Sequence, residues 1–115
     1  MSDETIFSKI IRGELPCDKV YETDDVLAFR DINPAAPVHV LVIPKKPIVN
    51  VGQADEDDAL LLGTLMLAAR EVARIEGLEE SGFRLVVNNG AEVGQTVFHL
   101  HVHVLGGRAF SWPPG

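Results

Sequence analysis

Apolar residues alternate with histidines from His99 to Leu105, near the end of the chain. Side chains of a strand point alternately to its two faces, so a strand here would place His99, His101 and His103 on one face and apolar residues on the other. Three imidazoles on one surface are costly to bury for structure alone, because each ring carries polar nitrogens. The pattern predicts a strand over residues 99–105 with one face in the core and one face that carries chemistry.

Hydrophobic periodicity predicts a short helix and four strands before this segment. Ile6, Phe7, Ile10 and Ile11 have helical spacing, which predicts a helix that spans residues 5–12 and ends at Gly13. The predicted strands comprise residues 20–22, 26–30, 38–43 and 83–87.

The fourth histidine, His39, lies in the third of these strands. Pro34 and Pro37 fix the backbone of the loop before it and bias that loop away from helix. Strand alternation places His39 on the same face as Leu41 and Ile43.

A long helix is predicted to begin within residues 54–58 and to end near residue 75. Acidic residues at its start favour the positive end of the helix dipole. The expected core stripe is Leu61, Leu65, Ala68, Val72 and Ile75, and a second apolar stripe is Leu62, Met66, Ala69 and Ala73. Two stripes predict either a deeply buried helix or contact with a second copy of the chain.

Composition narrows the class of protein and its partners. The chain has 115 residues, 46% hydrophobic and 23% charged, which fits a single domain over residues 1–115. Its formal net charge of -7 leaves no basic surface for polymeric nucleic acid. The single Cys17 cannot form an internal disulfide, the start of the chain is acidic, and the longest apolar run is too short to span a bilayer. We expect a cytoplasmic protein with no membrane partner.

Two classes of chemistry fit the histidine face. Histidines two apart on a strand are reasonable zinc ligands, although no carboxylate lies within the strand to support them. Alternatively, one neutral imidazole is a nucleophile toward phosphorus, and its neighbours orient it and bind the anion. The preceding loop contains Gly94, Gln95 and Thr96, a composition that suits anion binding but is also common in ordinary loops.

The segment from His99 to Leu105 matches the His-x-His-x-His-x-x signature, with x apolar, of the histidine triad superfamily of nucleotide hydrolases and transferases. Almost the whole chain resembles the Hint branch, the histidine triad nucleotide-binding proteins. The other matching segments are Thr5-Ile6-Phe7 with Lys9-Ile10-Ile11, Leu27-Ala28-Phe29 with Asp31-Ile32, His39 with Leu41 to Lys46, Val86-Val87-Asn88, and Gly106-Gly107-Arg108 with Trp112 to Gly115.

This resemblance implies an α+β protomer with a single HIT-like domain, in which two helices accompany a five-stranded antiparallel sheet. It implies a homodimer with a continuous ten-stranded sheet, paired through the long helix and one strand. The implied activity is that of a purine nucleoside phosphoramidase that needs no metal or cofactor. It would cleave adenosine 5′-phosphoramidate-type P–N bonds to the nucleoside monophosphate. Alternatives are a nucleotide-binding or scaffold protein with incidental hydrolysis, and a zinc-binding module.

The resemblance also implies roles for individual residues. His101 would be the nucleophile, with Nδ1–H held by a backbone carbonyl and Nε2 free to attack. His103 and Thr96 would contact the phosphate, His39 and His99 would support His101, and Asp31 would hold the ribose hydroxyls. The base pocket would comprise Ile6, Phe7, Ile10, Phe29 and Ile32. Asn88, Gly94 and Val97 would lie near the phosphate. Trp112 of the partner protomer would lie on the leaving-group side. The chain departs from the branch in having Thr96 where Ser is usual and Phe98 where Tyr is common.

Overall fold

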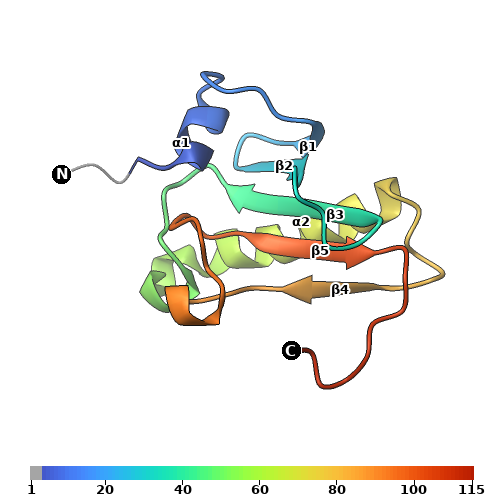
Figure 1. The fold of residues 1–115 in the computed structure, drawn as a ribbon. Coiled ribbons are helices and arrows are strands. Elements are labelled where there is room, and N and C mark those ends of the chain that lie inside the picture. Colours follow the sequence, from blue (N-terminus) through green and yellow to red (C-terminus); the bar gives the residue numbers. More distant parts are fainter. Residues whose placement is uncertain (1–3) are drawn as a thin grey trace.

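The computed structural model describes residues 4–115, which form a five-stranded antiparallel sheet between a long helix and a short one (Figure 1). The sheet order is β1-β2-β3-β5-β4. The strands are β1 Lys19–Glu22, β2 Val26–Arg30, β3 Val38–Pro44, β4 Phe83–Val86 and β5 Val102–Gly106; the α-helices are α1 Ile6–Ile11 and α2 Ala59–Ile75; and the 3₁₀ turns are η1 Val51–Gln53, η2 Glu56–Asp58 and η3 Ala91–Val93. This confirms the predicted α+β class, antiparallel sheet and two helices. The first three residues of the acidic start lie outside the described part.

Helix α1 is short because its two ends are closed within two turns. Thr5 Oγ1 accepts hydrogen bonds from the N–H groups of Phe7 and Ser8, and Ser8 Oγ accepts one from the Thr5 N–H. Gly13 follows the helix with φ +80°, a conformation that favours glycine. Because so short a helix is marginal alone, the buried Phe7 side chain supplies its attachment to the sheet.

The central strands bury both of their faces. In β2 and β3, one set of alternate residues packs toward α2 and the other set toward α1. The set toward α2 comprises Val26, Ala28, Val40 and Val42, and the set toward α1 comprises Leu27, Phe29, Leu41 and Ile43. Helix α1 covers only part of its face, which leaves room for polar chemistry farther along β3 and β5.

Helix α2 ends at Ile75 as predicted, but it begins at Ala59, after the predicted range of residues 54–58, which contains the 3₁₀ turn η2. Its buried stripe is also shifted around the helix axis. Ala69 and Ala73, assigned above to a second stripe, lie in the core of this chain, whereas Ile75 is 41% exposed and was wrongly assigned to the core. Because alanine side chains are small, the face of α2 that carries them can pack close against the sheet. Met66 remains 51% exposed, and neither helix in residues 4–115 has the length and apolar content to cross a bilayer.

Strand β5 begins at Val102, so the prediction of a strand from His99 onward was wrong for its first three residues. The β3–β5 ladder ends at the pair Val42 and Val102. Farther along β3, Pro44 has no N–H to donate, and its carbonyl accepts a hydrogen bond from the His99 side chain. Leu100 nevertheless joins Val102 and Val104 in the core beside α2, as the alternation predicted.

Gly106 provides a test of how tightly β5 packs. A Cβ at this position would lie 2.5 Å from Leu78 Cδ1, in the buried core. We therefore expect Gly106→Ala to lower the free energy of unfolding by about 1–3 kcal/mol, measured by chemical denaturation. Gly63→Ala is the matched control, since nothing lies within 4 Å of its Cβ position. An equal loss in both variants would contradict this account.

Candidate active site

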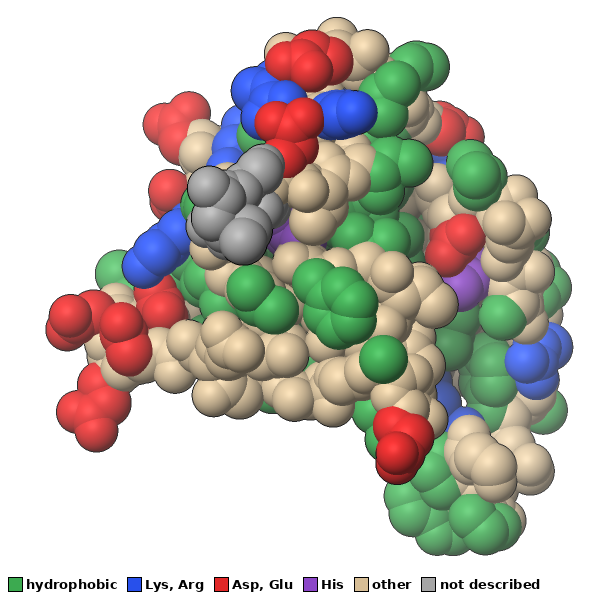
Figure 2. All heavy atoms as spheres, turned by 60° about the vertical axis from the view of Figure 1, so that its left-hand side comes forward, with side chains coloured by type: hydrophobic (Ala, Val, Ile, Leu, Met, Phe, Trp, Pro, Cys, Tyr) green, Lys and Arg blue, Asp and Glu red, His purple; other side chains and the backbone are tan. Residues whose placement is uncertain are grey.

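A cleft of about 230 Å³ lies between α1 and the uncovered part of the sheet. Figure 2 shows a histidine and an acidic side chain in a hollow bordered by hydrophobic side chains. The predicted site residues that line the cleft are Ile6, Phe7, Ile10, Phe29, Asp31, Ile32, Thr96, Val97, His101 and His103. Sequence reasoning missed the other lining residues, Pro16, Cys17, Asp18, Arg30 and Leu41. Leu41 was already placed on the His39 face, and that signal could have identified it.

His101 has a defined proton position. Its Nδ1 lies 2.7 Å from the His99 carbonyl oxygen, and a carbonyl only accepts, so Nδ1 carries the hydrogen. In the neutral ring Nε2 is then an unprotonated acceptor, as predicted. The Phe7 ring stands nearly perpendicular to the His101 ring, with centroids 5.2 Å apart, and the side chain is only 5% exposed. Packing and hydrogen bonding together fix the orientation of this imidazole.

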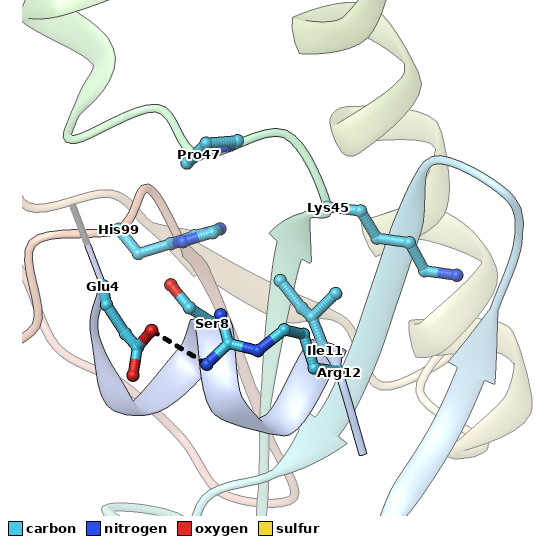
Figure 3. A pocket seen from close by; sticks show the side chains of 7 residues that line it. All are labelled: Glu4, Ser8, Ile11, Arg12, Lys45, Pro47 and His99. Carbon is cyan, nitrogen blue, oxygen red and sulfur yellow. Dashed lines mark ion pairs between the residues drawn. The ribbon is translucent and has the colours of Figure 1, made fainter. Parts of the chain in front are cut away.

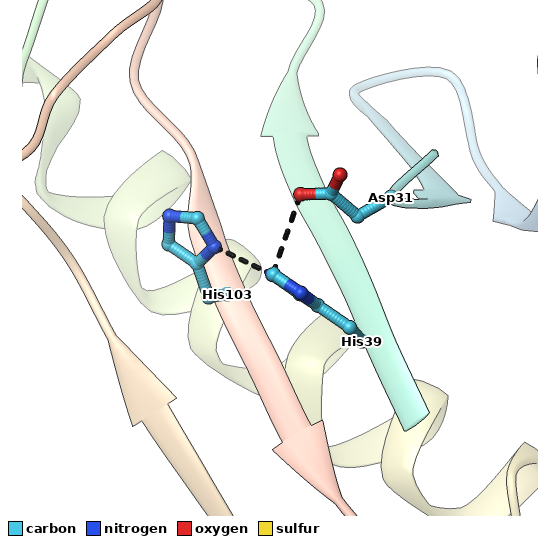
Figure 4. Close-up of side chains that lie close together, drawn as sticks. All are labelled: Asp31, His39 and His103. Carbon is cyan, nitrogen blue, oxygen red and sulfur yellow. Dashed lines mark hydrogen bonds and ion pairs between the residues drawn. The ribbon is translucent and has the colours of Figure 1, made fainter. Parts of the chain in front are cut away.

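A second chain of hydrogen bonds fixes His39 and His103 (Figure 4). The Ala35 N–H donates to His39 Nδ1 at 3.0 Å, so neutral His39 carries its hydrogen on Nε2. That Nε2 lies 2.9 Å from His103 Nδ1 and 3.4 Å from Asp31 Oδ2. His103 Nδ1 therefore accepts, and His103 Nε2 must carry the remaining hydrogen. Within residues 4–115 this buried Nε2–H has no acceptor.

The surroundings keep these two rings neutral. Burial lowers the pKa of His39, although the Asp31 carboxylate opposes the shift. Burial, followed by the neighbouring His101 and His39, lowers the pKa of His103 to about 4. At neutral pH His103 is thus a neutral hydrogen-bond donor rather than a cation.

His99 lies on the same side of the sheet as His101, because the Phe7 ring packs against both rings, but its side chain lines a different pocket from His101 and His103. Its Nε2 donates to the Pro44 carbonyl at 2.7 Å, and its side chain is 2% exposed. The ring lines a pocket of about 330 Å³, and Figure 3 shows it there with Ser8, Ile11 and Arg12. His99 therefore contributes its backbone carbonyl to His101, while its imidazole attaches this segment to the end of β3.

The loop before the histidines is held by Gln95, a buried residue whose role sequence reasoning missed. Its side-chain amide donates to the carbonyls of Val49 and Val97, and its Oε1 accepts from the Gly90 N–H. The amide is thus used within the fold and positions the neighbouring Thr96 at the cleft. A buried, fully bonded amide has no distinctive sequence signal.

Five predicted site residues are not part of the cleft lining: His39 and His99, described above, and Asn88, Gly94 and Trp112. Gly94, with φ +110°, places its Cβ position 3.5 Å from Asn88 Nδ2, so these two residues lie together beside the loop. Trp112 is 81% exposed in this protomer and is not part of its cleft.

The positions of the protons weigh against a metal centre. Ligand atoms of Asp31, His39 and His103 lie within 4.8 Å of one another. However, the Ala35 N–H occupies the lone pair of His39 Nδ1, which keeps the hydrogen on Nε2, the atom that faces the other two residues. His99 Nε2 and His101 Nδ1 are committed to backbone carbonyls. The histidines are arranged as a hydrogen-bonded network rather than as a convergent ligand set.

Comparison with known proteins agrees with the fold and the motif. The HIT domain family model matches residues 12–110. An uncharacterized HIT-like protein of Synechocystis is 64% identical over the full length of both chains. The crystal structure of a HIT family hydrolase from Legionella pneumophila is 47% identical with a TM-score of 0.94, covering 97% of this chain and 100% of that one. A histidine triad nucleotide-binding protein from Candida albicans is 31% identical with a TM-score of 0.82, covering 96% and 83%.

The low pKa of His103 predicts a pH dependence of stability. Unfolding returns the ring to its ordinary pKa near 6.5, so between about pH 4 and 6.5 the unfolded chain binds more protons. The free energy of unfolding should therefore fall as the pH drops through this window. The share due to His103 is at most about 3 kcal/mol, and solvent screening of this partly exposed ring reduces it. Chemical denaturation of wild type and His103→Gln at several pH values gives the free energy of unfolding as a function of pH. The difference between the two slopes measures the share due to His103. Identical slopes would contradict the assignment.

Proposed function

Since this chain belongs to the HIT domain family and is similar to solved HIT family hydrolases, we propose that it is a purine nucleoside phosphoramidase. It would hydrolyse adenosine 5′-phosphoramidate-type P–N bonds to the nucleoside monophosphate. One observation carries the proposal. A nucleophilic nitrogen, His101 Nε2, and a buried donor without a protein acceptor, His103 Nε2–H, belong to adjoining rings whose centroids are 5.0 Å apart.

The cleft suits a nucleotide in one orientation. The phosphate would lie at His101 and His103, within reach of the exposed Thr96 hydroxyl, with Val97, Gly94 and Asn88 nearby. Asp31 would accept hydrogen bonds from the ribose hydroxyls. Its carboxylate is held in a fixed orientation, because Oδ1 accepts a hydrogen bond from the Asn33 N–H and Oδ2 lies 3.4 Å from His39 Nε2. The apolar side chains of Ile6, Phe7, Ile10, Phe29 and Ile32 would enclose the base.

Catalysis would proceed in two displacements at phosphorus. The lone pair of His101 Nε2 attacks the α-phosphorus and forms a P–N bond, while the substrate P–N bond breaks and its electron pair leaves on the amine. The amine takes a proton from water, because neutral His103 binds the phosphate oxygen instead of transferring a proton. The hydroxide left by that water then attacks phosphorus, breaks the bond to His101 Nε2, releases the nucleoside monophosphate and restores neutral His101. The His99 carbonyl stabilises the imidazolium character that develops on His101.

Turnover of adenosine 5′-phosphoramidate, with and without a chelator, tests this function. We expect release of AMP that chelation does not change. His101→Ala should lower turnover by on the order of 10⁴-fold, since no substitute nucleophile is available. The same variant should still bind AMP, because the base pocket and Asp31 are unaltered.

His99→Ala is the comparison variant, with a smaller expected loss of about 10²- to 10⁴-fold because the His99 backbone carbonyl remains. Near-normal turnover by His101→Ala would refute the nucleophile assignment. Equal loss of bound zinc on removal of any one histidine would support the zinc module, and AMP binding without any turnover would support the nucleotide-binding scaffold.

The proposed protein is also a homodimer, with a ten-stranded sheet and the tail of each protomer near the cleft of the other. Two exposed features support this assembly. Leu60, Met66 and Leu67 on α2 are more than half exposed, and β4 lies at an edge of the sheet. In such a dimer the partner's Trp112 would lie on the leaving-group side of the site.

Met66→Arg should weaken the dimer, because it would place an unpaired charge in an apolar contact. Sedimentation at micromolar concentration should find a wild-type dimer and a larger monomer fraction in the variant. Leu15→Arg is the matched control, because Leu15 is also an exposed apolar side chain but belongs to neither α2 nor β4. A wild-type monomer, or equal dissociation of both variants, would argue against this interface.

A further inference from the structure

We propose that Arg108 is a positioning residue, which acts through Ala35 and His39 to keep His103 Nε2 a hydrogen-bond donor. This inference rests on the proposed function, in which that donor binds the phosphate. Arg108 is exposed and does not line the cleft, so any effect on the reaction must pass through other residues.

A continuous series of hydrogen bonds joins Arg108 to His103. Arg108 Nη2 donates to the Ala35 carbonyl at 3.1 Å. The Ala35 N–H donates to His39 Nδ1 at 3.0 Å, and His39 Nε2 lies 2.9 Å from His103 Nδ1. Arg108 therefore restrains the Ala35 carbonyl. The N–H of the same residue determines which nitrogen of His39 carries the hydrogen.

The Arg108 side chain is itself held in place by the C-terminal tail, which turns back beside the sheet after β5 (Figure 1). Its guanidinium lies 4.2 Å from the centre of the Phe110 ring, and that of Arg84 lies 5.1 Å from the same ring. Arg84 Nη2 also donates to the Ser111 carbonyl. Both arginines thus order the tail, but only Arg108 binds Ala35.

The start of the tail also packs against the loop that contains Ala35. A Cβ on Gly107 would lie 2.8 Å from Pro37 Cβ, and Gly107 has φ +88°, so glycine permits this close approach. The tail and the loop are therefore in contact at two points, Gly107 on Pro37 and Arg108 on Ala35.

Loss of this restraint has a specific chemical consequence. Without a fixed Ala35 N–H, His39 can carry its hydrogen on Nδ1 and accept at Nε2. His103 would then donate from Nδ1 and present a lone pair at Nε2, which repels a phosphate oxygen. Asp31, 3.4 Å from His39 Nε2, still favours the original arrangement, so the change should be partial.

The test compares Arg108→Ala with Arg84→Ala, which loosens the tail but keeps the bond to Ala35. We expect Arg108→Ala to lower kcat for adenosine 5′-phosphoramidate on the order of 10-fold, a fraction of the loss typical when a donor to the transition state is removed. The Tm should change little. KM should also change little, because it is governed by the base pocket, which the variant leaves unaltered. Arg84→Ala measures the share of any loss that comes through the tail and its Trp112, and we expect its kcat loss to be about 2-fold, well below that of Arg108→Ala.

Imidazole ¹⁵N spectra of the free proteins report the tautomers directly. In wild type and Arg84→Ala, His39 Nδ1 and His103 Nδ1 should be unprotonated, whereas Arg108→Ala should show a mixture. Unchanged tautomers in Arg108→Ala, or equal kcat losses in both variants, would overturn the proposal. If wild type does not turn over the phosphoramidate, the proposed function fails, but the spectra still decide whether Arg108 controls the histidines.

Discussion

Backbone amides decide which nitrogen carries the hydrogen in each of the four histidines. A carbonyl only accepts and an N–H only donates, so the carbonyls of His99 and Pro44 and the N–H of Ala35 leave one neutral tautomer for each ring they bind. His103 follows because it pairs with His39. Burial opposes protonation of His39, His99 and His103, which favours the neutral form of these three rings.

The architecture of the sheet makes this arrangement possible. Helix α2 and the apolar sets of β2, β3 and β5 form a core on one face that is complete without the other face. The opposite face can therefore hold polar rings, and a short helix α1 suffices to cover the part around Phe7. The end of the β3–β5 ladder at Val42 and Val102 lets His101 approach the backbone of its own segment, which a continuous strand would not allow.

Periodicity in the sequence predicted the strands and both helices, whereas the antiparallel sheet and the residues of the cleft followed from the resemblance to the histidine triad superfamily. The alternation through Leu100, Val102 and Val104 describes their burial correctly although the strand begins later than predicted. Features that depend on the position of a single backbone group were beyond such reasoning. The Pro44 carbonyl that diverts His99, the Ala35 N–H that orients His39 and the internal bonds of Gln95 join segments far apart in the chain. Helical spacing placed Ile75 on the core stripe, but at this end of α2 it is Ala69, Val72 and Ala73 that face the core.

Phe7 belongs at once to the attachment of α1 and to the wall of the cleft. A helix of 6 residues has little stability of its own, so its docking depends on the packing of this ring with Phe29 and His101. A base that fills the cleft adds contacts to the docked helix and none to a detached one. Ligand affinity and the local opening equilibrium of α1 are therefore linked, so a ligand that fills the cleft would stabilise this helix against local unfolding.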